Sequence, residues 1–275
     1  MSRGAGGRRE WSGKRAALIV AHPGHELRVH GWLELTRPRV FVLTDGSGRS
    51  GASRLEYTTQ VLERAGAERG GVYGRFTDRA LYAAILDGDV ELFRTLVDEL
   101  GAALADGRFT DIVGDAAEGY NPVHDLCRLL INAAVLSVRG IRGPAIRNLD
   151  FSPIGAPGGP PDGGRNETTR LRLGGAALTR KMAAARAYEP LQAEVREALT
   201  AEPPGAAASE VLRVVEEPAG RYRLAELPPY YERYGEQQVA GGHYEHVIRY
   251  REHMLPIADA IHASVASRAG LREGR

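Results

Sequence analysis

An apolar run passes directly into a pair of histidines in the segment Ala16-Ala-Leu-Ile-Val-Ala-His-Pro-Gly-His-Glu26. Residues 16–21 predict a buried strand, because a short, continuous apolar run is typical of the interior strands of a parallel sheet. Polar residues that directly follow such a strand lie in the ligand crevice at the carboxyl ends of the strands. The segment therefore predicts an α/β fold with its chemistry at His22 and His25.

Strand and helix patterns alternate through the first half of the chain. Residues 40–44 and 111–114 predict two further strands. The predicted helices carry apolar residues at a period near 3.6, and they cover residues 26–35, 54–65, 90–104 and 124–138. This alternation predicts a Rossmann-like parallel sheet with helices on both faces.

The second half of the chain has a different pattern. Residues 156–164 are rich in proline and glycine and predict an exposed loop, and residues 201–209 predict a second loop. Residues 178–200 predict a helix that is interrupted at Pro190, because proline lacks the amide hydrogen. We therefore expect a C-terminal helical and loop extension.

Three parts follow from these patterns. We expect residues 1–13 to form a disordered basic tail and residues 14–150 to form the Rossmann-like, metal-binding core. Residues 151–275 are expected to form the extension, which packs on the core and closes the pocket.

The composition excludes several classes of protein. The 275 residues include 36 Lys and Arg against 35 Asp and Glu, and this near-neutral balance argues against a nucleic-acid binder. The apolar run at residues 16–21 is too short for an export signal or a membrane span, so we expect a cytoplasmic protein without a membrane partner. The single cysteine, Cys127, excludes an internal disulfide, so histidine and carboxylate would have to hold any metal.

Two histidine-containing segments are candidates for a metal site. His22 and His25 are three residues apart across a Pro-Gly turn, close enough to share one ion. His124 follows the strand predicted at residues 111–114 and opens a helix, which makes it a candidate third ligand. The alternative is that Pro-Gly is only a turn and that the histidines are surface residues.

Acidic residues accompany the second segment. Asp115, Glu118 and Asp125 could support the ligands or act as a base. Asp125 could instead be an acid favoured by the helix dipole, and Asn121 could be a helix cap.

Three motifs together resemble a known family. Ala21-His-Pro-Gly-His-Glu26, Leu43-Thr-Asp-Gly46 and Asn121-Pro-Val-His124 occur in the order seen in PIG-L/LmbE-like zinc-dependent N-deacetylases of N-acetylglucosaminyl and related substrates. Arg54 and Glu56 also resemble the start of a helix in that family. The resemblance covers residues 15–140 well and the remainder only loosely.

The resemblance implies a metal site with an unusual ligand. His22 matches the first metal ligand of the family and His124 the last, whereas His25 stands where an aspartate ligand is usual. The implied site has three histidines. Zinc is the expected ion, and iron or copper are the alternatives, because neutral imidazoles also suit those metals.

The catalytic positions depart further from the family pattern. Gly24 stands where the family has the aspartate that acts as general base, and glycine cannot take a proton. Asn121 replaces the histidine that assists the tetrahedral intermediate; it can donate a hydrogen bond to an oxyanion but cannot supply a proton. Val123 replaces the aspartate that orients that histidine.

Three interpretations remain open. The chain could be an amide hydrolase in which another carboxylate serves as base, and the candidates are Glu26, Asp45, Asp115 and Glu118. It could be a repurposed metalloenzyme with iron or copper and redox or other non-hydrolytic chemistry. It could also be a non-catalytic descendant that binds a ligand.

A glycine-rich loop provides candidate substrate contacts. Gly46-Ser-Gly-Arg-Ser-Gly51 lacks the Gly-Lys-Ser/Thr ending of a phosphate loop, so no nucleotide cofactor is implied. Arg49 and Arg54 could contact an anionic or hydroxyl-rich substrate, or they could be ordinary surface charges.

Further candidate contacts lie beside and after the core motifs. His243 and His246 have the spacing of one helix face, and we expect them to line the pocket with Tyr120; a second metal site or a polar lid is the alternative. The C-terminal tyrosines suit packing on a sugar ring or a homo-oligomer interface. We expect a small-molecule substrate that is sugar-like or an N-acylated amine.

Overall fold

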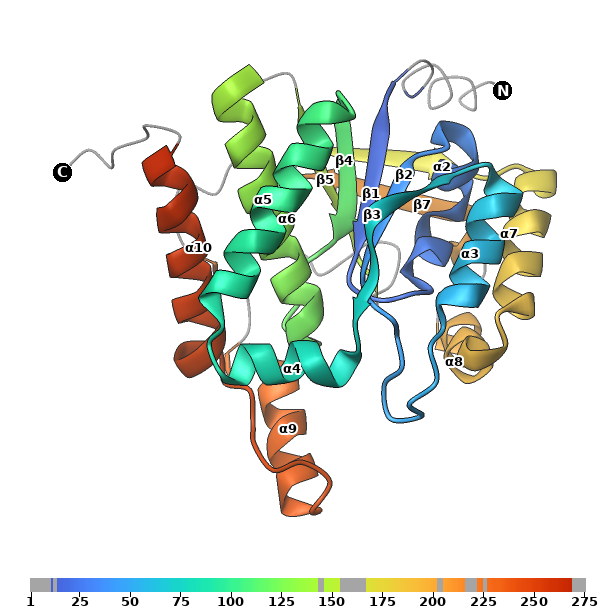
Figure 1. Cartoon of the computed structure of the whole chain (residues 1–275). Helices are drawn as coiled ribbons and strands as arrows, with labels where there is room; N and C mark the ends of the chain where they lie inside the picture. The colour runs from blue at the N-terminus through green and yellow to red at the C-terminus, as the bar shows by residue number, and fades with distance from the viewer. Residues whose placement is uncertain are drawn as a thin grey trace.

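The computed structural model describes Trp11 and residues 14–142, 146–153, 167–201, 205–215, 222–224 and 227–268. Within these ranges, seven strands form one sheet in the order β3-β2-β1-β4-β5-β7-β6 (Figure 1). The strands are β1 (Ala16–Val20), β2 (Arg39–Thr44), β3 (Glu68–Phe76), β4 (Asp111–Asp115), β5 (Arg147–Phe151), β6 (Thr168–Arg172) and β7 (Ser209–Val214).

Helices and single helical turns connect these strands. The α-helices are α2 (His30–Thr36), α3 (Leu55–Ala65), α4 (Asp78–Leu86), α5 (Val90–Asp106), α6 (Pro122–Arg142), α7 (Gly175–Ala187), α8 (Gln192–Ala201), α9 (Tyr230–Ala240) and α10 (Leu255–Arg268). The 3-10 turns are η1 (His25–Val29), η2 (Glu189–Leu191) and η3 (Ala206–Ala208), and η4 (Tyr250–Met254) is a π-helical turn.

β1 lies in the middle of the parallel part of the sheet. It pairs in parallel with β2 and with β4, and β3 and β5 extend the two sides in the same direction. β7 pairs antiparallel with β5, and β6 pairs antiparallel with β7. The prediction of an α/β fold with a mostly parallel sheet is confirmed.

The region expected to be only helix and loop contributes two strands to this sheet. β6 has the sequence Thr-Thr-Arg-Leu-Arg and alternates exposed and half-buried residues, so no apolar run marks it. β3 was also absent from the expected strands, because its sequence contains three glycines, which are depleted in strands. Residues after 151 are therefore part of the central sheet as well as a cover for it.

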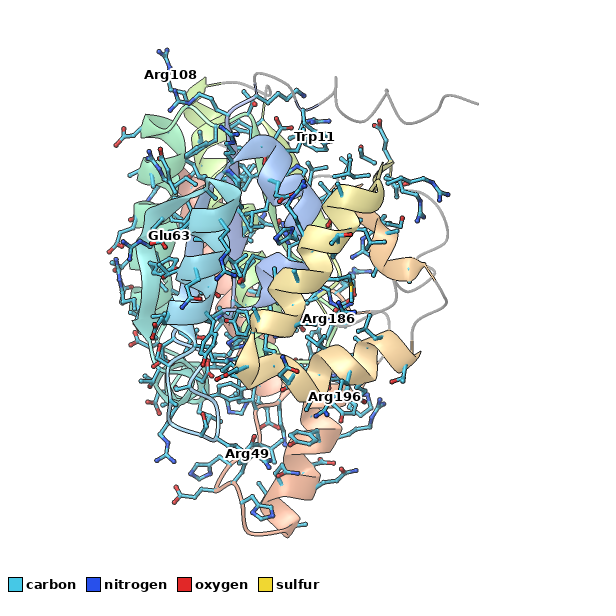
Figure 2. The ribbon with its side chains drawn as sticks, turned by 90° about the vertical axis from the view of Figure 1, so that its right-hand side faces the viewer. Trp11, Arg49, Glu63, Arg108, Arg186 and Arg196 are labelled. Carbon is cyan, nitrogen blue, oxygen red and sulfur yellow. The ribbon has the colours of Figure 1, made fainter. Side chains whose placement is uncertain are left out.

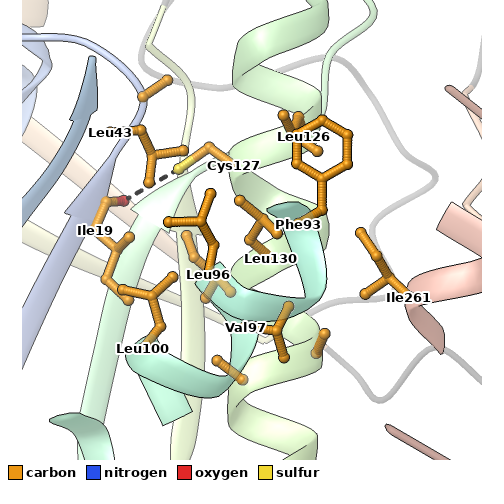
Figure 3. Close-up of a cluster of buried hydrophobic side chains, with 14 of the residues drawn as sticks. Ile19, Leu43, Phe93, Leu96, Val97, Leu100, Leu126, Cys127, Leu130 and Ile261 are labelled. Carbon is orange, nitrogen blue, oxygen red and sulfur yellow. Dashed lines mark hydrogen bonds between the residues drawn. The ribbon is translucent and has the colours of Figure 1, made fainter. Parts of the chain in front are cut away.

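Helices cover both faces of the sheet, as expected. Ala17 and Ile19 of β1 pack on one face with α4, α5, α6 and α10. Leu18 and Val20 pack on the other face with α2, α3 and α7. Figure 3 shows the first cluster, in which Cys127 of α6 is fully buried beside Ile19.

Most of the predicted helices are present. α3, α5 and α6 lie within a few residues of the predicted bounds, and the predicted helix at residues 26–35 is divided into η1 and α2. The interruption expected at Pro190 is the turn η2 between α7 and α8. The predicted loop at residues 156–164 lies outside the described residues.

Trp11 corrects one part of the predicted N-terminal tail. Its side chain is 1% exposed and packs edge to face on Trp32, with 6.0 Å between the ring centroids. The guanidinium carbon of Arg147 lies 4.5 Å from the ring centroid of Trp11. Trp11 is therefore part of the core. Figure 2 shows it at the opposite end of the molecule from Arg49.

The carboxyl ends of the parallel strands meet at one edge of the sheet, below the strands in Figure 1. From β1 the chain first builds β2 and β3 on one side and then returns to build β4 and β5 on the other. Such a point of reversal is the usual ligand crevice of an open α/β sheet. In the described part of the chain, no helix is long and apolar enough to span a lipid bilayer.

Candidate metal centre

The structure brings His22, His25 and His124 together at this point of reversal. His22 and His25 lie in the turn after β1, and His124 lies in the first turn of α6, which follows β4. The ring centroids of His22 and His25 are 5.4 Å apart, those of His22 and His124 are 5.0 Å apart, and those of His25 and His124 are 4.6 Å apart. Residues from two neighbouring strand ends therefore form one histidine cluster.

Local sequence explains how each histidine reaches the cluster. Gly24 has a φ of 106°, a conformation that L side chains rarely adopt, and it turns the chain sharply between His22 and His25. Asn121 caps α6, because its Oδ1 accepts a hydrogen bond of 2.8 Å from the Val123 amide. Pro122 occupies the first helical position, which needs no amide hydrogen. His124 is thus held in the first turn of α6.

Two ring nitrogens in the cluster are buried without a hydrogen-bond partner, namely Nε2 of His22 and Nδ1 of His124. An unpaired buried polar atom is costly, and a metal ion is one group that would satisfy it. Burial, together with the neighbouring His25, lowers the pKa of His22 and holds that of His124 well below the usual value. Both imidazoles are therefore neutral at pH 7, as metal ligands must be.

The spacing of the rings also suits a tetrahedral ion. An ion ~2.0–2.1 Å from one nitrogen of each ring would hold the ring centroids roughly 5 Å apart, close to the spacings here. Within the described ranges, no three His, Cys, Asp or Glu side chains already form a coordination group, so small side-chain rotations would have to complete it. The donor set fits zinc, and iron or copper by the same chemistry.

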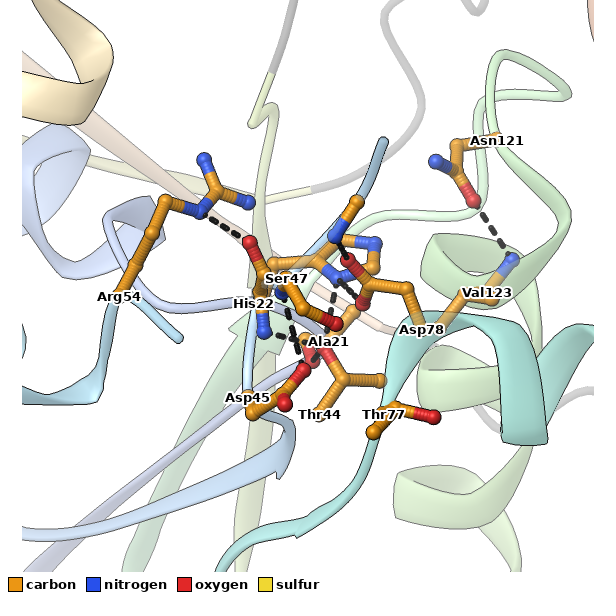
Figure 4. A network of polar contacts seen from close by, with 12 residues as sticks. Ala21, His22, Thr44, Asp45, Ser47, Arg54, Thr77, Asp78, Asn121 and Val123 are labelled. Carbon is orange, nitrogen blue, oxygen red and sulfur yellow. Dashed lines mark hydrogen bonds and ion pairs between the residues drawn. The ribbon is translucent and has the colours of Figure 1, made fainter. Parts of the chain in front are cut away.

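Two carboxylates contact the Nδ1 atoms of His25 and His22. Nδ1 of His25 lies 2.9 Å from both carboxylate oxygens of Asp115. Nδ1 of His22 lies 3.0 Å from Oδ1 of Asp78 and 2.8 Å from Oγ1 of Thr44 (Figure 4). Asp115 was a predicted site residue, whereas Asp78 was not.

Asp78 was missed because β3, the strand before it, was not predicted. The signal available was Thr77-Asp78, a capping residue and an acid at the start of a helix, and Oγ1 of Thr77 does accept a hydrogen bond from the Ala80 amide. Burial alone would raise the pKa of Asp78, but its interactions with His22, Thr44 and the Gly48 amide together hold it well below the usual value.

Glu26, a predicted base candidate, is fully buried away from the cavity. Its Oε2 accepts a hydrogen bond of 2.8 Å from the Gly24 amide, and its Oε1 accepts one of 2.8 Å from the Thr58 hydroxyl. Burial raises its pKa. These contacts hold the turn that carries His22 and His25 in shape.

The carboxylates of Asp45 and Glu118, two further base candidates, also accept hydrogen bonds from neighbouring groups. Oδ1 of Asp45 accepts a hydrogen bond from the Ser47 amide, and the Asp45 carbonyl accepts one from the Arg54 amide, which shapes the loop after β2. Oε1 of Glu118 accepts a hydrogen bond from the Ser152 hydroxyl. Of the five carboxylates considered, Asp78 lines the cavity beside the histidines, whereas Glu26, Asp45, Asp115 and Glu118 do not.

Asn121 is oriented by a second contact. Its Oδ1 accepts a hydrogen bond of 3.1 Å from the Tyr82 hydroxyl in addition to that from Val123. Because the Val123 amide can only donate, the Asn121 atom that faces it is the side-chain oxygen, and the Tyr82 hydroxyl then donates to the same oxygen. Its amide nitrogen points away from the start of α6 (Figure 4), and Asn121 is one of the residues that line the cavity.

A large cavity of about 1350 Å³ opens beside the histidines. All five predicted substrate contacts line it, namely Arg49, Arg54, Tyr120, His243 and His246. His243 and His246 are exposed and lie in the loop after α9, so the expectation of one helix face is wrong. Gly241 and Gly242 follow directly after α9 and explain why that helix ends before them.

No family model matches the chain, and no curated protein sequence matches it. Solved structures do. A crystal structure of the A40926 pseudoaglycone deacetylase matches with a TM-score of 0.52 at 21% identity, covering 75% of this chain and 99% of that one. A deacetylase from the biosynthesis pathway of teicoplanin matches with a TM-score of 0.54 at 15% identity, covering 75% of this chain and all of that one. The chain shares the fold of these deacetylases. At such identities, the similarity establishes the architecture, and function has to be argued from the site.

Proposed function

We propose that the chain is a metal-dependent amide hydrolase that removes the acyl group from an N-acylated amino sugar or a related N-acyl amine. The observation that carries the proposal is the cluster of His22, His25 and His124, which leaves Nε2 of His22 and Nδ1 of His124 buried and unpaired. The fold shared with two deacetylases of antibiotic pathways supports the reaction class.

In this proposal, the three histidines hold one zinc ion at the end of the cavity. When bound there, zinc would supply a water with a pKa of about 7 and would polarise a substrate carbonyl. The amide nitrogen of Asn121, held in place by Tyr82 and Val123, donates a hydrogen bond to the oxygen of that carbonyl as negative charge develops on it.

Proton transfer is the weak step in this site. Gly24 supplies no carboxylate, and Glu26, Asp45, Asp115 and Glu118 do not line the cavity. Asp78 does line it, but its two oxygens contact Nδ1 of His22 and the Gly48 amide. Loss of a general base costs about 10²–10⁴ in rate. We therefore propose a slow hydrolase in which solvent accepts the proton.

The substrate side of the cavity is aromatic. The rings of Tyr120 and Tyr230 stack at 4.8 Å with 5° between their planes, and each residue is 42% exposed. Arg49 donates a hydrogen bond of 2.8 Å to the Tyr234 hydroxyl and so connects the loop after β2 to α9. We propose that Tyr120 and Arg54 contact the ring and the polar groups of the substrate, with His243 and His246 at the rim.

The absence of a carboxylate at position 24 favours a second candidate. The same histidines could hold iron or copper and support a redox or other non-hydrolytic reaction on this scaffold. A ligand-binding protein without catalysis is the third possibility.

Metal analysis combined with an amine-release assay separates these functions. The purified protein is analysed for zinc, iron and copper, and amine release is measured from N-acetylglucosamine and its phenyl glycoside, with and without a chelator. Zinc at about one ion per chain and chelator-sensitive release support the hydrolase. Iron or copper without release supports the second candidate, and a chain that binds no metal contradicts both.

A further inference from the structure

The His25–Asp115 contact restricts the protonation of His25. Both oxygens of Asp115 lie 2.9 Å from Nδ1, and Oδ2 also accepts a hydrogen bond of 2.7 Å from the Ala21 amide. A carboxylate only accepts hydrogen bonds, so Nδ1 of His25 has to carry the proton. Nε2 is then the ring nitrogen with a lone pair.

The contacts of His22 lead to the same result. Oδ1 of Asp78 lies 3.0 Å from Nδ1 of His22, and Oδ2 of Asp78 accepts a hydrogen bond of 2.6 Å from the Gly48 amide. Oγ1 of Thr44 lies 2.8 Å from the same nitrogen, and its hydroxyl donates to the Ala21 carbonyl, so both neighbours of Nδ1 act as acceptors. Nδ1 of His22 therefore also carries the proton, and the lone pair is on Nε2, which is buried without a partner. Nε2 of His22 is thus the nitrogen that can bind a metal ion.

Both carboxylates are themselves held in place. Asp115 is fully buried at the end of β4, and its bond to Ala21 connects β4 to the end of β1. Asp78 is 8% exposed at the start of α4, and its bond to Gly48 connects α4 to the loop after β2. Each histidine is therefore oriented by a group that cannot easily turn away from it.

We propose that Asp78 and Asp115 are positioning residues that hold His22 and His25 as Nδ1–H tautomers, present both Nε2 atoms to a metal ion and supply the negative charge that three neutral imidazoles lack. The inference rests on the proposed metal site and goes beyond the reaction, because it specifies which nitrogens bind and what orients them. Carboxylate partners of metal-binding histidines fix the tautomer and raise the basicity of the ligand.

The tautomers can be tested in the metal-free protein. Long-range ¹H–¹⁵N correlation spectra of the apo protein distinguish protonated Nδ1 from protonated Nε2 for each imidazole, and H22Q and H25Q assign the signals. We expect His22 and His25 to be Nδ1–H in the wild type. A wild-type spectrum with Nε2–H at either residue overturns the proposal, whether or not the protein is an enzyme.

Measurements of zinc affinity test whether the two carboxylates strengthen metal binding. The variants D78N and D115N keep a side-chain oxygen near Nδ1 but remove the charge, and we expect each to weaken zinc binding by about 10–100-fold in a competition titration with a chromophoric chelator. D111N is the matched control, because Asp111 is also fully buried but lies at the other end of β4, paired with Arg147. We expect its zinc affinity to equal that of the wild type.

The control variant D111N also distinguishes a positioning role from general destabilisation of β4. Equal losses of affinity in D111N and D115N would assign the effect to general destabilisation of β4 and overturn a positioning role. Wild-type affinity in D78N and D115N would overturn it as well. If D115N does not fold, the zinc affinity of D78N and the tautomers of His22 and His25 in the wild type still test the positioning role. Zinc binding without hydrolysis would contradict the proposed reaction but leave this inference standing.

Discussion

A Cβ atom built on Gly24 would lie 2.3 Å from Cδ1 of Leu191. Leu191 ends the turn η2 and therefore comes from the C-terminal half of the chain, whereas Gly24 lies in the turn between His22 and His25. The position where the resembling family carries its base is thus covered by an apolar side chain. The φ of 106° favours glycine at this position, and a larger side chain would also have to displace the end of the Leu191 side chain.

The first prediction concerns stability at this contact. We expect G24A to lower the free energy of unfolding by about 1–3 kcal/mol, because it combines backbone strain with a clash. L191A removes the clash but not the strain, so G24A should cost less in the L191A background. Urea unfolding of the two single variants and the double variant measures this coupling. Equal costs of G24A in both backgrounds would show that Leu191 does not restrict position 24.

The second prediction concerns the missing base. We expect G24D alone to give little gain in amine release, because its side chain starts against Leu191. In the L191A background, G24D should raise the rate by up to about 10²–10⁴, the usual contribution of a general base. The comparison is with L191A alone, on the same N-acetylglucosamine phenyl glycoside. No gain in the double variant would argue that more than the base has been lost.

The third prediction concerns the ligands. We expect H22A and H124A to lose bound zinc, since each removes one of three ligands and leaves two. Zinc content after dialysis, measured by mass spectrometry, tests this. H262A, on α10, is the control and should retain wild-type content. Full zinc occupancy in H22A or H124A would overturn the site assignment.

The fourth prediction is a pH dependence of stability at Asp125. Burial raises the pKa of Asp125 to about 7, although the Tyr222 hydroxyl and the amides of Gly119 and Glu118 donate hydrogen bonds to it. Its ordinary pKa is 3.8. Between these values the folded protein binds more protons than the unfolded chain, so stability falls as pH rises.

The variant D125N isolates this contribution. We expect the free energy of unfolding of the wild type, relative to D125N, to fall by up to about 1.4 kcal/mol per pH unit between pH 4 and pH 7 and then to level off. Chemical unfolding at a series of pH values measures the difference. A difference that stays constant over this interval would show that Asp125 titrates normally.

The fifth prediction concerns Trp11. Because its ring is 1% exposed and packs between Trp32 and Arg147, we expect W11A to lower the free energy of unfolding by about 3–5 kcal/mol. L199A, at a residue that is 44% exposed, is the control and should cost much less. A W11A protein as stable as the wild type would restore the interpretation of this region as a free tail.

Much of the fold could be predicted from local patterns. The apolar run before His22 predicts β1 because a buried strand needs no polar face, and the helical periods of α3, α5 and α6 depend on residues three or four apart. His22, His25 and His124 could be grouped because the carboxyl ends of neighbouring parallel strands meet at one edge.

Other features depended on residues far apart in the chain. β6 carries no apolar run, and it is a strand because β7 provides its hydrogen-bond partner. Asp78 is 56 residues from His22 and was invisible without β3, while Leu191 reaches Gly24 only through the packing of η2 on the turn. Periodicity reports which face of an element is buried. Only the folded chain decides which side chains from different elements meet. Here it decided which carboxylates contact the histidines and which side chain lies against Gly24.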